Sequence, residues 1–219
     1  MRVHPQEGRR AAAPDTRRRI LTIALELFSA HGYAGTSMRD IAETMGMTKA
    51  ALYYHFASKE QILEAATEPI RTEMTSMLQL AAGPPRPAAE QLLTRLVDIL
   101  SRHALLIETV FNDPSSGDRG QRREQQLAAK EVFRAIISAL AGDDGPGSLV
   151  RARCAVGAVL FAVRATVHSD PRLAEPVLSD QALRLLGGEE HALDAAVRRE
   201  VVAAALRALG EPAPSPARG

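Results

Sequence analysis

The sequence predicts an all-α protein in which a small N-terminal domain of three short helices precedes a larger helical domain. Three observations support this fold class. Alanine, leucine and arginine, which favour helix, dominate the 219 residues, and runs of β-branched residues are few. Apolar residues recur at helical spacing, and no segment alternates convincingly as a strand would. Breaks rich in glycine and proline divide the chain into segments of helical length.

The first helix is expected to begin at a cap supplied by Asp15 or Thr16 and to run to about His31, where Gly32 ends it. Residues 1–14 hold arginines, alanines and two prolines and are expected to form a disordered basic arm. The apolar face of this helix repeats at helical spacing. It consists of Ile20, Ile23, Ala24, Leu27 and Phe28.

The second and third helices are defined by their caps. Thr36 and Ser37 precede the second helix, and Ser37 with Asp40 three residues later has the spacing of a capping box. Gly46 is expected to end that helix, because glycine adopts the left-handed conformation easily. Thr48 should cap a third helix that reaches about residue 55.

The remaining chain predicts a longer helical domain, residues 63–210, which follows an N-terminal domain of residues 15–62. Ser58 with Gln61 suggests another capping box, and Pro69 should bend or divide the helix that follows. Residues 211–219 are expected to form a disordered tail. The expected helices span residues 58–82, 88–111, 121–141, 148–168 and 189–209, with short helical turns around 170–188.

Composition argues for a cytoplasmic protein. The single cysteine, Cys154, cannot form an internal disulfide bond. The N-terminus lacks an apolar segment of signal-peptide length. The longest uncharged apolar run, residues 154–163, is about half of the ~20 residues that a membrane helix needs, so no membrane span is expected.

No pattern in the sequence indicates catalysis, a metal or a cofactor. The six histidines lack metal-ligand spacing with a cysteine or carboxylate. There is no nucleophile motif and no catalytic carboxylate pair. The adjacent aspartates of "GDDGPG", residues 142–147, would repel a phosphate, so a plain loop is the expected structure. Cys154 is interpreted as a small core residue rather than a redox sensor. We therefore expect neither enzymatic activity nor a cofactor.

Charge is distributed unevenly although the net charge is only +1. Residues 1–60 carry nine Lys and Arg against six Asp and Glu, a balance of +3, and the remainder has a balance of −2. A basic end can bind a polyanion, but basic segments often serve only solubility.

Residues 38–55 have the pattern of a helix-turn-helix. Gly46 permits a tight turn between the second and third helices, Ala42 lets them approach closely, and Leu52 fixes their angle. The third helix is short and poor in apolar residues, so it is better suited to a surface than to a core. Small residues such as Ala50 and Ala51 would let it enter the ~12 Å major groove.

The segment "RRRILTIALELFSAHGYAGTSMRDIAETMGMTKAALYYHFASKEQIL", residues 17–63, resembles the N-terminal domain of TetR-family transcriptional regulators. The resemblance rests on the Gly32–Tyr33 pair, the Thr36–Ser37 helix start and "LYYHF" followed by "SKE". It covers about a fifth of the chain. Many relatives have glycine at the position of Ala50.

The resemblance implies a homodimer that binds double-stranded DNA at a near-palindromic operator and is released by an unidentified small-molecule effector. It implies phosphate contacts from Thr36, Thr48, Tyr53, Tyr54 and Lys59. It places Lys49, Ala50 and His55 at or near base edges, and Arg39 near backbone or base.

Several of these residues also have structural interpretations. Tyr53 could belong to the core with its hydroxyl at the rim, and His55 could be a helix C-cap. The run Arg17, Arg18 and Arg19 could be a solvated helix face or part of an arm that faces DNA.

In the larger domain, the helices at 148–168 and 189–209 are expected to form a four-helix dimer interface. For 148–168 an internal core helix is the alternative. An effector pocket is expected among the helices at 58–82, 88–111, 121–141 and 148–168. Its candidate lining residues are Met74, Met77, His103, Glu108, Phe111, Phe161 and Arg164, with Phe133 and His168 as further possibilities.

The function that the sequence supports is a ligand-responsive, sequence-specific transcriptional regulator, most simply a repressor. One alternative is a helical small-molecule carrier or enzyme in which the helix-turn-helix is only structural. Another is a protein-interaction module. The polar, cationic character of residues 48–59 disfavours the latter, because the centre of a protein interface is usually apolar.

Overall fold

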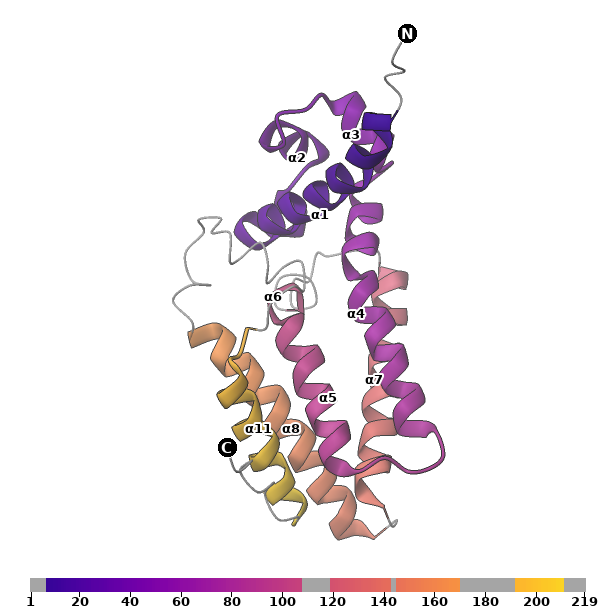
Figure 1. The fold of residues 1–219 in the computed structure, drawn as a ribbon, viewed down its shortest axis with the longest axis vertical. Coiled ribbons are helices and arrows are strands. Elements are labelled where there is room, and N and C mark those ends of the chain that lie inside the picture. Colours follow the sequence, from indigo (N-terminus) through magenta and orange to yellow (C-terminus); the bar gives the residue numbers. More distant parts are fainter. Residues whose placement is uncertain (1–6, 108–118, 143–144, 170–191, 211–219) are drawn as a thin grey trace.

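The computed structural model describes residues 7–107, 119–142, 145–169 and 192–210, and within these ranges every regular element is an α-helix (Figure 1). The all-α prediction is therefore confirmed. The helices are α1 (Glu7–Gly35), α2 (Met38–Thr44), α3 (Lys49–His55), α4 (Lys59–Ala82), α5 (Ala89–Arg102), α6 (Ala104–Leu106), α7 (Arg119–Ala141), α8 (Pro146–Ser169) and α11 (Ala195–Leu209).

The first helix starts earlier than expected. α1 begins at Glu7, within the segment predicted to be a disordered arm, because arginine and alanine residues of strong helix propensity extend it toward the N-terminus. Its regular part ends at Gly32, whose φ of 73° is outside the helical range, so the predicted stop is confirmed. A further turn then carries the chain to Gly35.

The predicted caps around α2 and α3 are confirmed. The Ser37 hydroxyl accepts from the Asp40 N–H, and the Asp40 carboxylate accepts from the Ser37 N–H at 2.8 Å. This bond from the Ser37 N–H lowers the pKa of Asp40. Gly46 has a φ of 65°, and the Thr48 hydroxyl accepts from the Ala51 N–H at 3.2 Å. These local bonds fix the ends of two helices that are only seven residues long.

The fourth helix, α4, runs from the small domain along the larger one (Figure 1). Ser58 caps it as expected, but Gln61 accepts from the Ala57 N–H rather than from Ser58, so the capping box is incomplete. Pro69 lies inside the helix without dividing it. α4 packs on α1 at one end and on α5 and α7 further along.

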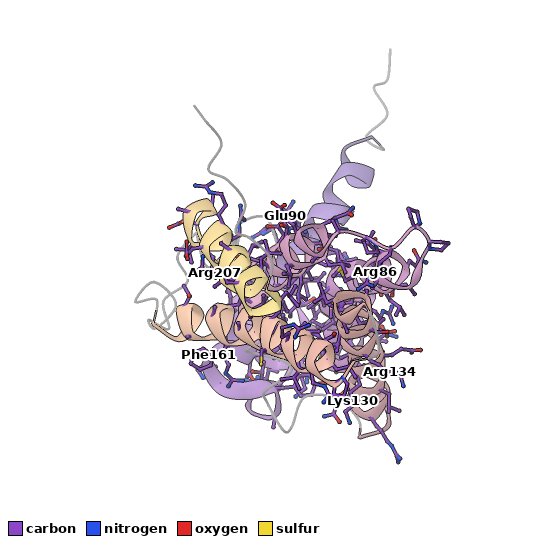
Figure 2. All side chains as sticks on the ribbon, turned by 90° about the horizontal axis from the view of Figure 1, so that it is seen from below. Arg86, Glu90, Lys130, Arg134, Phe161 and Arg207 are labelled. Carbon is purple, nitrogen blue, oxygen red and sulfur yellow. The ribbon has the colours of Figure 1, made fainter. Side chains whose placement is uncertain are left out.

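The larger domain is a bundle in which α7 packs on α4 and α8, while α11 packs on α5 and α8. Side chains fill the space between these helices when the bundle is viewed from its end (Figure 2). α5 supplies the most regular apolar stripe. Its fully buried members are Leu92, Leu93, Leu96, Val97 and Ile99.

Two predicted helix bounds in this domain are wrong. The helix expected at 88–111 ends at Arg102, because His103 has non-helical angles (φ −105°, ψ 14°). The helix expected from residue 189 begins at Ala195, where the Asp194 carboxylate accepts from the first N–H groups of α11. The turns expected around 170–188 lie outside the described residues, as does the 211–219 tail.

The chain before α11 is fixed to α5 through Ser101, which is fully buried. The Ala192 N–H donates to the Ser101 carbonyl at 2.9 Å, and the Leu193 N–H donates to its hydroxyl at 3.0 Å. These bonds set the position of α11 on the bundle.

The segment Pro146–Thr166 of α8 is long and apolar enough to cross a membrane by length and composition, with a mean hydropathy of 1.4. About a third of this apolar stretch is buried, and α8 packs against α5, α7 and α11. One such helix is weak evidence for a membrane span, because core helices have the same composition.

Candidate nucleic-acid interface

The third helix presents a polar surface to solvent. The side chains of Tyr54 and Tyr53 are 86% and 47% exposed. Tyr53 is therefore not a core residue. We call the exposed set the α3 surface; it consists of Thr48, Lys49, Ala50, Tyr53 and Tyr54.

The opposite face of α3 holds the helix in place. Leu52 and Phe56 are buried with Ile41 and Ala42 of α2. The Met47 N–H donates to the Ala42 carbonyl at 3.0 Å and closes the turn between the two helices. The helix-turn-helix pattern in the sequence corresponds to this packed pair.

The chemistry of the α3 surface suits a phosphate backbone. The ammonium of Lys49 and the phenol groups of Tyr53 and Tyr54 are hydrogen-bond donors, and α3 itself contains no acidic residue. Ala50 adds little bulk at the centre, so a groove edge could approach closely.

The carboxyl end of α3 is fixed by a residue of α1. The Arg17 guanidinium donates from Nη1 to the His55 carbonyl oxygen at 2.8 Å. Its Cζ atom lies 3.9 Å from the centre of the Phe56 ring, over its face. The sequence did not single out this role, because Arg17 lies 38 positions before His55 and within a run of three arginines.

Thr36, which was expected to contact a phosphate, is buried in the structure. Its side chain is 2% exposed, and its hydroxyl lies within hydrogen-bonding distance of the Leu27 and Gly32 carbonyl oxygens, at 3.1 and 3.0 Å. The Thr36 hydroxyl therefore stabilises the end of α1 and does not face solvent.

Lys59 also has an internal role in the structure. Its Nζ atom donates to the carbonyl oxygens of Tyr33 at 2.5 Å and Thr36 at 2.8 Å, and lies 4.1 Å from the centre of the Tyr33 ring. The Tyr33 hydroxyl donates to Glu60 at 3.0 Å. We call Lys59, Glu60 and Tyr33 the α1–α4 clamp, because they join the start of α4 to the end of α1.

The other predicted residues near α3 lie at its margins. Arg39 is exposed on α2 and pairs with Glu43, Nε to Oε1 at 2.6 Å. His55 is half-buried, and its ring meets that of Tyr54 edge to face. His55 is the last residue of α3, at the edge of the α3 surface.

A buried carboxyl group within this domain was not anticipated. Glu26 of α1 is 5% exposed, and Oε2 has no hydrogen-bond partner among the described residues. Burial raises the pKa of Glu26 to about 7. In the sequence, Glu26 lies beside the apolar face of the first helix rather than within it. Its helical position therefore gave no indication that the carboxyl group is buried.

Among the residues expected to line an effector pocket, those that the structure describes do not all face the interior of the bundle. Met77 and His103 are buried and Met74 is half-buried, all facing the interior of the bundle. Phe161 and Arg164 are exposed on the outer side of α8, so their placement in an interior pocket was wrong. The reason is that α8 is apolar on several sides, and its sequence alone could not identify the buried face. Glu108 and Phe111 lie outside the described residues.

His103 belongs to a polar cluster between α4 and α5. Glu73 accepts two bonds from Arg102 at 2.6 and 2.7 Å, and His103 Nε2 lies 3.5 Å from the Glu73 carboxylate. Burial lowers the pKa of His103, and Glu73 opposes this effect. The predicted ligand contact of His103 thus has an internal partner.

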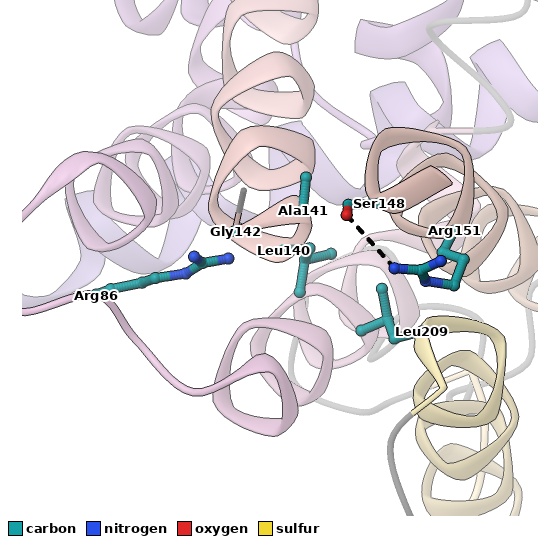
Figure 3. A pocket seen from close by; sticks show the side chains of 7 residues that line it. All are labelled: Arg86, Leu140, Ala141, Gly142, Ser148, Arg151 and Leu209. Carbon is teal, nitrogen blue, oxygen red and sulfur yellow. Dashed lines mark hydrogen bonds between the residues drawn. The ribbon is translucent and has the colours of Figure 1, made fainter. Parts of the chain in front are cut away.

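A groove of about 520 Å³ lies at the end of the bundle remote from α3 (Figure 3). Arg86 and Arg151 extend into it from two sides, and the Arg151 guanidinium donates to the Ser148 hydroxyl at 3.4 Å. Arg86 also donates to the Ala139 carbonyl at the end of α7. None of the predicted pocket residues that the structure describes lines this groove.

Within the described parts of the chain, no group of three or more His, Cys, Asp or Glu residues could hold a metal ion. Cys154 is exposed on α8, so its interpretation as a core residue was wrong.

Comparisons with known proteins agree with this geometry. Residues 20–66 match the family described as "Bacterial regulatory proteins, tetR family". The HTH-type transcriptional regulator AcrR of Shigella flexneri is 32% identical over 107 residues, which are 46% of this chain and 50% of that protein. The negative transcriptional regulator IcaR of the biofilm operon icaADBC in Staphylococcus aureus (strain Newman) is 46% identical over 50 residues, 23% of this chain and 27% of that protein.

The N-terminal domain of the chain is of the TetR type. The crystal structure of Mycobacterium smegmatis AmtR is similar over 90% of this chain and 96% of its own, with 26% identity and a TM-score of 0.56. The TetR-family regulator PfmR of Thermus thermophilus shares the fold, with 23% identity, a TM-score of 0.53 and coverage of 79% and 100%. The chain spans half or less of the length of the curated relatives that it matches.

Proposed function

We propose that this protein is a sequence-specific DNA-binding transcriptional regulator, and that it acts as a repressor. The observation that carries the proposal is the α3 surface, a solvent-exposed helix face with phenol and ammonium donors on a helix-turn-helix. Thr48, Tyr53 and Tyr54 would contact phosphates, while Lys49 and Ala50 would lie at base edges, with His55 and Arg39 at the margin. The name of IcaR, a negative regulator, supports the direction of regulation.

The active form in this proposal is a homodimer on a near-palindromic operator. The outer side of α8 carries an apolar face that has no partner among the described residues of the chain. We call it the α8 face, and its members recur at helical spacing: Val150, Cys154, Gly157, Ala158 and Phe161. Phe161 is 75% exposed and lies at the outer edge of the bundle (Figure 2). In the proposed dimer this face is buried against a second copy, together with α11. Binding to successive major grooves requires the two α3 helices to lie ~34–36 Å apart.

Release from DNA is proposed to follow the binding of a small molecule in the larger domain. α4 is suited to carry the effect, because it packs on α5 and α7 in that domain and is joined to α1 by the α1–α4 clamp. A ligand that favours one position of α4 would shift the population of operator-binding dimers. A cytoplasmic location is part of the same proposal, since a regulator must reach the chromosome. The absence of enzymatic activity is also part of it, because regulation by DNA binding requires no catalysis.

The test is selection of bound sequences from a library of random duplexes by the purified full chain at two salt concentrations. Recovery of an inverted repeat is the expected result, with affinity that falls steeply as salt rises. Retention without sequence preference would reject sequence-specific regulation, and no retention at low salt would favour a structural helix-turn-helix.

A further inference from the structure

α3 is too short to be stable alone, so its orientation depends on contacts at its ends. α3 has only seven residues, and an isolated helix of that length is marginal in water. Its amino end is fixed locally by Thr48. Its carboxyl end leaves carbonyl groups without partners inside the helix, as all helices do.

Arg17 satisfies one of these carbonyl groups from another helix. Its bond to the His55 carbonyl at 2.8 Å places a positive charge at the negative end of α3. The same guanidinium covers the face of the Phe56 ring at 3.9 Å, and Phe56 is 1% exposed. The Arg17 guanidinium therefore joins α1 to both the last residue of α3, His55, and its C-cap residue, Phe56.

We propose that Arg17 is a positioning residue that determines sequence specificity without touching DNA. It holds the carboxyl end of α3 at the angle at which Lys49 and Ala50 reach base edges. Binding to base edges needs that angle, whereas non-specific attraction to phosphates needs only charge. This inference rests on the proposed function of DNA recognition.

The test compares Arg17→Ala with Arg19→Ala in the full chain. Arg19 lies on the same helix and is exposed, so its removal changes the charge equally. Affinity for the selected operator and for a scrambled duplex is measured over a series of salt concentrations, below the melting temperature of each variant. We expect Arg17→Ala to reduce the ratio of specific to non-specific affinity about tenfold, the effect of losing one charge-assisted hydrogen bond.

The salt dependence separates positioning from a direct phosphate contact. A positioning residue leaves the slope of log affinity against log salt equal to that of Arg19→Ala. A phosphate contact would lower the slope by about one and weaken both duplexes alike. That outcome, or an unchanged specificity ratio in Arg17→Ala, would overturn the proposal.

A second variant and a measurement without DNA keep the proposal testable if Arg17→Ala folds poorly. Arg17→Lys retains the charge but loses the planar stack, so we expect a specificity ratio between those of wild type and Arg17→Ala. In the free protein, amide NMR shifts of residues 52–56 should change in Arg17→Lys and remain constant in Arg19→Ala. Unchanged shifts would reject the contact itself. A wild-type protein without sequence preference would instead reject the proposed function.

Discussion

Polar residues of the DNA-binding domain differ in solvent exposure, and this decides whether they can contact a ligand or only stabilise the fold. Tyr54 is almost fully exposed and free to meet a ligand, whereas Thr36 is buried and holds the end of α1. Both are polar residues of the same motif in the sequence. Their different roles follow from the helix face on which each side chain lies.

Glu26 is expected to make the stability of this domain depend on pH. Burial raises its pKa to about 7 from the ordinary value of 4.5. The folded state binds the proton of Glu26 more tightly than the unfolded state does. Protonation of Glu26 therefore stabilises the fold fully below pH 4.5, and this stabilisation is lost as the pH rises through 7. Glu26→Gln should therefore raise the free energy of unfolding at pH 8 by about 2 kcal/mol, with a much smaller gain at pH 5.

Urea unfolding at both pH values measures this effect. Glu64→Gln is the matched control, because Glu64 is exposed on α4. Equal changes at pH 5 and pH 8 in Glu26→Gln would show that the carboxyl group does not titrate as its burial suggests.

At the scale of elements, the α1–α4 clamp joins the helix that leads into the bundle to the helix that supports α3. Lys59→Met removes two hydrogen bonds from the ammonium group while keeping an apolar side chain of similar length. We expect it to lower the free energy of unfolding by about 2 kcal/mol, because charged hydrogen bonds at a half-buried site are lost.

Lys49→Met is the control for this prediction, because Lys49 is an exposed lysine of the α3 surface. It should leave the unfolding midpoint in urea unchanged and weaken DNA binding in a filter or anisotropy assay. If Lys59→Met left stability intact and only reduced DNA affinity, Lys59 would be a phosphate contact rather than a clamp.

At the scale of the whole molecule, the α8 face is the surface that the proposed homodimer buries. Phe161→Arg places a charge within the apolar surface that the proposed dimer buries. We expect light scattering to report the mass of one chain instead of two, with loss of operator binding. Leu127→Arg is the control, because Leu127 is also exposed and apolar but lies on α7. Equal loss of the dimer in both variants would place the interface elsewhere.

The sequence by itself determined the helices of the DNA-binding domain and most of their ends. The reason is that caps are local: Ser37 reaches Asp40, Thr48 reaches Ala51, and Gly46 supplies a left-handed turn without help from distant residues. The TetR-type motif also named Lys49, Tyr53 and Tyr54, which are all exposed on α3.

Only the tertiary structure decided which polar and apolar residues face inward. Arg17 and His55 are 38 positions apart, and Lys59 is 26 from Tyr33, so no local pattern connects them. α8 is apolar on several sides, and its packing on α5, α7 and α11 left Phe161 outside. Local hydrogen bonds are encoded within a few residues, whereas burial depends on which helices meet, and that is a property of the whole fold.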